Sequence, residues 1–130
     1  PLWRERLCKA CVESPFWNPF VDPTYPRASP LLIQHCYHLC RILEFTRLQP
    51  TDFSDVFEFG AGYGSFVRLL RNLGASPTHW IYDLPHMILI QKFYLENVFA
   101  DRIHTDPGFL DTVHWLSGDP GDPDVSAELE

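Results

Sequence analysis

One short segment restricts the fold of this chain more than any other, the glycine-rich stretch Glu58-Phe59-Gly60-Ala61-Gly62-Tyr63-Gly64. A β-prone run, Val56 to Phe59, precedes it, and a stretch with helical spacing, Ser65 to Leu73, follows it. Glycine adopts the positive φ of a sharp turn out of a strand, and it lets a ligand approach the backbone closely. The N–H groups and the positive dipole end of the helix then favour an anionic group of the ligand. The segment therefore predicts a nucleotide-binding turn between a strand and a helix.

The region after the turn repeats the alternation of strand and helix. His79 to Tyr82 predicts a second strand that ends at Asp83, and Pro85 begins a helix that runs to about Phe99. We expect a third strand at Arg102 to Thr105 and one or two helical turns at Phe109 to Leu116. Strands that alternate with helices in this way predict an α/β protein with a parallel, doubly wound sheet.

The region before the turn predicts helices. Leu2 to Val12 has the apolar spacing of a short amphipathic helix. Ser29 and Pro30 are an N-cap and a first helical residue, and the helix that they begin runs to about Leu48. The fold class that we expect is α/β, with N-terminal helices followed by the first half of a Rossmann-like, doubly wound parallel sheet.

Charge and composition suggest three parts. We expect residues 1–50 to be a helical cap or dimerisation segment, residues 51–117 a nucleotide-binding half-domain, and residues 118–130 an acidic, disordered tail. The net charge is −7, and six of the seventeen acidic residues lie between Asp111 and Glu130, where there is no lysine or arginine. Because no basic patch could neutralise a run of phosphates, we expect no nucleic-acid partner.

The four cysteines form two closely spaced pairs, Cys8-x-x-Cys11 and Cys36-x-x-x-Cys40. Such pairs raise the question of a zinc site. Both lie in predicted helices without the glycine-containing turn of a structural zinc site, so we favour reduced, buried thiols and expect no metal. No apolar stretch approaches the roughly 20 residues that span a membrane, and the N-terminus has no secretory pattern. We therefore expect a cytoplasmic protein with no membrane partner.

Two features distinguish between the cofactors that bind at such turns. A dinucleotide turn has the pattern Gly-x-Gly-x-x-Gly, which would require glycine in place of Ser65. Here a carboxylate, Glu58, stands two residues before Gly60, and it suits an ammonium or sulfonium group better than a pyrophosphate. Asp83 follows Gly60 by 23 residues, a separation at which an acid accepts hydrogen bonds from ribose hydroxyls. Asp83 would alternatively be an Asx-type cap of the next helix. Together, these features favour S-adenosylmethionine over NAD.

The segment Val56 to Gly64 resembles motif I of class I S-adenosylmethionine-dependent methyltransferases. Ile81-Tyr82-Asp83-Leu84-Pro85-His86-Met87-Ile88 resembles the second-strand motif of small-molecule O-methyltransferases. The longer run through Gln91-Lys92-Phe93-Tyr94-Leu95, with Tyr25-Pro26-Arg27 and the helix Leu31 to Leu43, is most similar to the sugar O-methyltransferase family. The resemblance implies that the glycine-rich turn binds the methionine end of the cofactor, that Asp83 binds the ribose, and that Leu84 and Met87 lie beside the adenine. The expected cofactor site is Glu58, Gly60, Ala61, Gly62, Tyr63, Gly64, Asp83, Leu84 and Met87.

The resemblance also implies a function, methyl transfer to a hydroxyl of a sugar or a related small molecule. A complete methyltransferase of this class has seven strands. This chain ends near the third and lacks an initiator methionine, so we expect a fragment that is inactive alone. An open sheet edge or the N-terminal helices would then pair two copies. The alternatives are an NAD- or flavin-dependent oxidoreductase and a non-catalytic cofactor-binding or assembly module.

Fewer sequence features indicate where the methyl acceptor would bind. Tyr25-Pro26-Arg27 predicts a clamp in which Arg27 binds an anionic group of the acceptor, although Arg27 would equally suit a structural ion pair. A general base or a metal assists the attack of an alkyl hydroxyl. The six histidines are scattered, and scattered histidines are usually surface or capping residues, so the sequence identifies no catalytic base.

Overall fold

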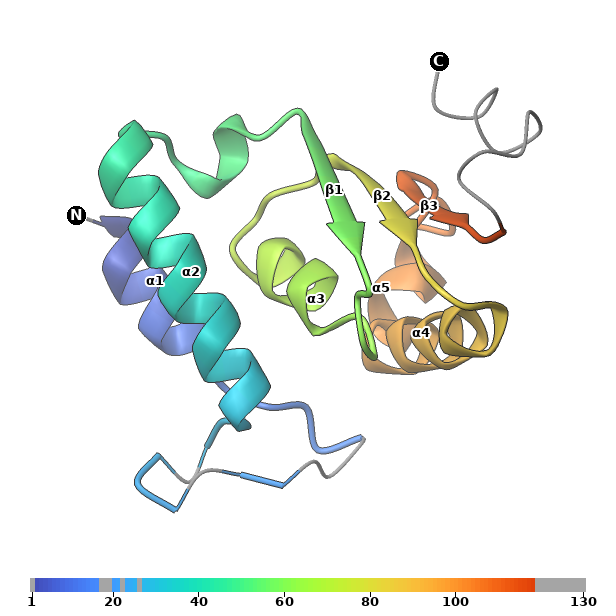
Figure 1. Ribbon diagram of the computed structural model, residues 1–130, viewed down its shortest axis with the longest axis horizontal. Helices are drawn as coiled ribbons and strands as arrows, with labels where there is room; N and C mark the ends of the chain where they lie inside the picture. The colour runs from blue at the N-terminus through green and yellow to red at the C-terminus, as the bar shows by residue number, and fades with distance from the viewer. Residues whose placement is uncertain (1, 17–19, 22, 26, 119–130) are drawn as a thin grey trace. The chain divides into compact units, whose positions relative to one another are not determined.

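Figure 1 shows the computed structural model of the chain, which describes residues 2–16, 20–21, 23–25 and 27–118. They form a mixed α/β structure with two compact units, unit 1 (residues 1–54 and 64–77) and unit 2 (residues 55–63 and 78–130). Within the described ranges, no helix is long and apolar enough to cross a membrane. The expected acidic tail lies, apart from Gly118, outside the described residues, and the domain boundaries expected from the sequence remain a prediction.

Unit 1 contains three α-helices among its described residues, α1 (Leu2–Ala10), α2 (Pro30–Thr46) and α3 (Ser65–Asn72), and a short 3-10 helix, η1 (Pro50–Asp52). The predicted start of α2 is confirmed, because Leu32 N donates to Ser29 Oγ at 3.1 Å and Pro30 is the first helical residue. Its end is confirmed within two residues. Helix α3 ends before Gly74, which has the left-handed φ of 83° expected at a helix C-terminus.

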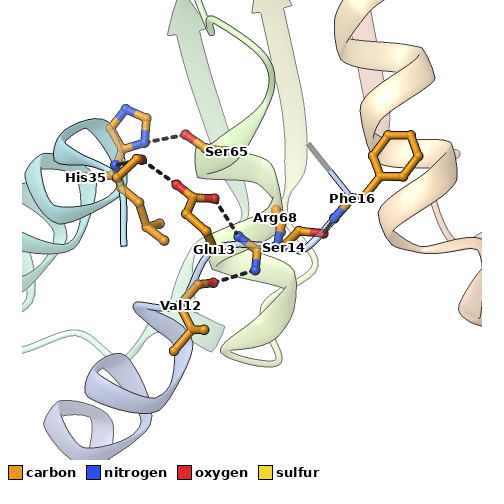
Figure 2. A network of polar contacts seen from close by, with 9 residues as sticks. Val12, Glu13, Ser14, Phe16, His35, Ser65 and Arg68 are labelled. Carbon is orange, nitrogen blue, oxygen red and sulfur yellow. Dashed lines mark hydrogen bonds and ion pairs between the residues drawn. The ribbon is translucent and has the colours of Figure 1, made fainter. Parts of the chain in front are cut away.

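Unit 1 has an apolar core and a buried ion pair. Helix α2 packs against α1 and α3, and its buried side chains are Leu32, Cys36, Leu39 and Leu43. Beside this core, Glu13 and Arg68 form an ion pair at 3.5 Å between side chains that are only 6 % and 9 % exposed. Figure 2 shows how Arg68 also donates to the Val12 carbonyl, while Ser65 Oγ lies 2.9 Å from His35 Nδ1. Ser29 Oγ donates to the second oxygen of Glu13.

Unit 2 contains a parallel sheet with the strand order β1 (Asp55–Phe59), β2 (Thr78–Tyr82) and β3 (Val113–Leu116). Helices α4 (Pro85–Val98) and α5 (Ala100–Thr105) connect β2 to β3, as Figure 1 shows. Partner residues in the register share a face, so the alternation of burial in β1 and β2 defines two faces. One face carries Glu58, His79 and Ile81, which are largely buried, and the other carries Phe57 and Phe59, which are 57 % and 76 % exposed.

Two predictions for the end of unit 2 are wrong. Arg102 to Thr105 is not a strand but the end of α5, where the Thr105 hydroxyl donates to the carbonyls of Asp101 and Arg102. The helical turns expected at Phe109 to Leu116 are instead a hydrogen-bonded turn region followed by β3. The apolar run Val113 to Leu116 has the composition of a strand, and it pairs in parallel with β2.

Candidate functional site

The glycine-rich turn has the backbone that its sequence predicts. It follows β1 and leads into α3, and Gly60, Gly62 and Gly64 have φ values of 71°, 59° and 89°. These are left-handed conformations that cost a residue with a Cβ roughly 1–2 kcal/mol. The alternating glycines therefore give a chain path that few other sequences could follow.

Asp83 lies beside this turn because the strand ladder continues past the ends of the strands. Phe59 pairs with Tyr82 in the parallel register. Gly60 N donates to the Tyr82 carbonyl at 2.9 Å, and Asp83 N donates to the Leu116 carbonyl at 3.1 Å. The first residue of the turn and the first residue after β2 consequently meet at the carboxyl edge of the sheet, where ligands bind in open α/β sheets.

A buried amide, Gln91 of α4, connects the acid to the turn. Its Nε2 donates to Asp83 Oδ2 at 2.7 Å and to the Gly62 carbonyl at 3.0 Å. Asp83 Oδ1 accepts from Leu84 N at 2.8 Å, so the local cap predicted as the alternative role is also present. Because one nitrogen binds both acceptors, the Asp83 carboxylate is held toward the glycine-rich turn and not away from it.

The Gln91 side chain retains one unused acceptor. Gln91 is 0 % exposed, and its Oε1 has no hydrogen-bond partner among the described residues. The amide orientation is well determined, since both partners of Nε2 are acceptors. A buried carbonyl oxygen without a donor costs about 1–3 kcal/mol, so Gln91 holds Asp83 and Gly62 at some cost to the stability of unit 2.

Glu58 makes a contact that the sequence did not suggest. Its Oε2 lies 2.9 Å from His79 Nε2, and the two side chains are 15 % and 2 % exposed. The contact follows from the sheet, because Glu58 and His79 project from the same face of β1 and β2. One carboxylate oxygen of Glu58 thus contacts the neighbouring strand β2. The expected role of Glu58 at the methionine end of the cofactor remains a prediction.

The other residues that we expect at the cofactor site have different environments. Ala61 is 2 % exposed and Leu84 is 60 % exposed, while Met87 is partly buried on the first turn of α4. The Tyr63 ring meets the buried Tyr94 ring edge-on, with their centroids 4.9 Å apart. The Tyr63 ring packs on α4, which anchors the end of the turn within unit 2, and the exposed Leu84 presents an apolar surface next to Asp83.

The two residues expected on the acceptor side belong to unit 1. Tyr25 is 39 % exposed, and its carbonyl accepts from Arg27 N at 2.7 Å. The Arg27 carbonyl accepts from Glu13 N at 2.7 Å, and the Arg27 side chain is exposed. These backbone contacts make the segment part of the structure of unit 1, and an acceptor role for either side chain remains a prediction.

Four of the histidines have defined contacts, and one of them, His38, has its ring tilted against that of Tyr37 with centroids 5.9 Å apart. His35 binds Ser65, His79 binds Glu58, and the His114 ring stacks on Trp80 with centroids 4.4 Å apart. Each of these contacts has a structural explanation, and none identifies a catalytic base. Among the described residues, no group of three or more His, Cys, Asp or Glu side chains is placed to hold a metal ion.

Sequence reasoning missed Gln91 and His79 as parts of the site. The sequence feature that could have indicated Gln91 is a polar side chain on the same side of the predicted helix as the apolar Ile88 and Leu95. For His79, the signal was its position on the face of β2 that also bears Ile81. Both signals become specific only when the register and the helix orientation are known.

Comparison with known proteins does not assign the chain to a family. The chain matches no protein-family model, no curated protein and no solved structure.

Proposed function

We propose that this chain is the S-adenosylmethionine-binding portion of an O-methyltransferase, whose acceptor is a sugar or a related small hydroxylated molecule. The observation that carries the proposal is the Asp83 carboxylate, held beside a left-handed glycine turn by the buried Gln91. The parallel three-stranded sheet agrees with the first half of a Rossmann-like fold. In this proposal, it is part of a seven-stranded methyltransferase domain in the cytoplasm.

The residues present fit an adenosyl ligand. A carboxylate has about four acceptor positions, and Gln91 and Leu84 N occupy one on each oxygen of Asp83. The remaining positions would accept the two ribose hydroxyls. Leu84 and Met87 would supply apolar contacts to the base.

The cofactor, when bound, supplies an activated sulfonium methyl group. The turn from Gly60 to Gly64 would hold the methionine end, and its backbone N–H groups would orient the cofactor carboxylate. The main task of the protein would be alignment, since a well-oriented pair of reactants removes much of the barrier. This assignment gives the unit a binding role and leaves the acceptor chemistry to further groups.

The test is equilibrium binding of S-adenosylhomocysteine and NAD, measured by titration calorimetry. We expect micromolar-range affinity for S-adenosylhomocysteine and none for NAD. Asp83→Asn should weaken binding by about 100-fold, because two hydrogen bonds to a charged acceptor contribute about 1.5 kcal/mol or more each. Asp101→Asn, an exposed change in α5, is the matched control and should leave the affinity unchanged.

Two outcomes would refute the proposal. Binding of NAD without binding of S-adenosylhomocysteine would favour the oxidoreductase alternative. Equal affinity of the wild type and Asp83→Asn for S-adenosylhomocysteine would show that the cofactor binds elsewhere.

A further inference from the structure

The four cysteines line one cavity of unit 1, although the two pairs are far apart in the sequence. This cavity has a volume of about 520 Å³. It is lined by residues of α1 and α2, and by Cys11, which follows the end of α1. Among the described residues, its lining is mostly apolar apart from the thiols and includes no Lys, Arg, Asp or Glu. The lining residues are Leu7, Cys8, Cys11, Thr24, Tyr25, Ile33, Cys36, Tyr37 and Cys40.

Two of these thiols interact with each other. Cys11 and Cys36 are each 8 % exposed, both line this cavity, and each thiol influences the pKa of the other. Burial raises the pKa of both thiols, so both are protonated near neutral pH. Cys8 is exposed and Cys40 is partly buried, which places them nearer the surface of the same cavity.

The geometry distinguishes between kinds of metal. Structural zinc binds four ligands, but the described residues hold no group of three or more ligands placed for a metal. Two thiolates in an apolar cavity suit a soft ion such as Cu(I). Its complex with two thiolates has a charge of −1, whereas zinc with four thiolates has −2, and a buried site penalises the larger charge.

We propose that Cys11 and Cys36 form a binding site for one soft monovalent metal ion of the Cu(I) class, with Cys8 and Cys40 as neighbouring sulfur groups. Two S–H protons are released to solvent, and two metal–sulfur bonds form. No electron is transferred. The site belongs to unit 1 and does not depend on the proposed methyltransferase function.

The experiment is an anaerobic Cu(I) titration of the reduced full chain in competition with a chromophoric Cu(I) chelator. We expect one ion per chain and a rise in Tm, because an ion that prefers the folded state stabilises it. The Cys11→Ser/Cys36→Ser variant should lose more than about 100-fold in affinity, beyond the cost of losing an outer-shell partner. The Cys8→Ser/Cys40→Ser variant is the matched control and should lose less than about 10-fold.

A second measurement uses the unmodified chain and does not require that the variants fold. Ag(I), a soft monovalent probe, should protect Cys11 and Cys36 from alkylation under mild denaturant, while Cys8 stays reactive. Equal Cu(I) affinity in the Cys11/Cys36 variant, an unchanged Tm, or Ag(I) protection of Cys8 and Cys40 alone would each overturn the proposal.

Discussion

The buried polar groups around Glu13 in unit 1 and around Gln91 in unit 2 are hydrogen-bonded to different degrees. In unit 1, the Glu13 carboxylate accepts hydrogen bonds from Arg68 and Ser29, and Arg68 also donates to the Val12 carbonyl (Figure 2). Both charged groups therefore find their partners within the protein, and we call this network closed. In unit 2, Gln91 holds Asp83 and Gly62 but leaves Oε1 without a partner among the described residues. A closed network stabilises a fold, whereas a buried acceptor without a donor lowers its stability. The cluster around Glu13 therefore has a structural role, and the amide that holds Asp83 beside the glycine-rich turn is less completely bonded.

Removing Arg68 should produce the largest effect. Arg68→Met leaves Glu13 buried without its ion-pair partner, and we expect the free energy of unfolding to fall by about 3–5 kcal/mol in urea denaturation. The affinity for S-adenosylhomocysteine should be unchanged at temperatures where the variant is folded. Arg41→Met, in an exposed ion pair with Glu44, is the control and should cost less than about 1 kcal/mol. Similar losses in the two variants would contradict a special role for the closed network.

Removing the amide of Gln91 should have an intermediate effect on stability and a specific effect on binding. Gln91→Met deletes the two hydrogen bonds that hold Asp83 beside Gly62, so S-adenosylhomocysteine should bind about 10-fold more weakly, and the free energy of unfolding should fall by about 1–2 kcal/mol. Calorimetric titration and urea denaturation measure the two quantities. Gln34→Met, an exposed change in α2, should alter neither. A variant that lost stability but kept its full affinity would make Gln91 purely structural.

The smallest expected effect concerns pH. Burial raises the pKa of Cys36, so the folded chain keeps this proton at pH values above about 8.5, the ordinary pKa of a thiol, where the unfolded chain loses it. The contribution is complete below the pKa of the unfolded thiol and decreases as the pH rises above it. Between pH 7.5 and pH 9, the free energy of unfolding should fall by roughly 1 kcal/mol more in the wild type than in Cys36→Ala. Parallel pH profiles of the two proteins would rule out a buried Cys36 thiol.

The sequence predicts local features of this chain better than features that depend on distant contacts. The cap at Ser29, the glycine turn and the first two strands follow from residues within a few positions of one another. The third strand was misplaced, because the choice between Arg102–Thr105 and Val113–Leu116 depends on pairing with β2. In the candidate site, Asp83 was identifiable from its spacing. The link through Gln91 was not, because it requires the orientation of α4.

The cysteines also show that local sequence does not predict contacts between distant residues. The sequence predicted reduced, buried thiols in two helices, whereas Cys8 is exposed and Cys40 is only partly buried. That both pairs border one cavity depends on how α1 packs against α2, which no local pattern encodes.

The outward-facing aromatic side of the sheet has a practical consequence for handling the protein. Phe57 and Phe59 present apolar rings to water, and mutual repulsion from a net charge of −7 opposes the sticking of one molecule to the next at neutral pH. That repulsion vanishes near the isoelectric point of about 5.2. Purification and crystallisation in mildly acidic buffers should therefore bring turbidity, and alkaline, low-salt buffers should keep the solution clear.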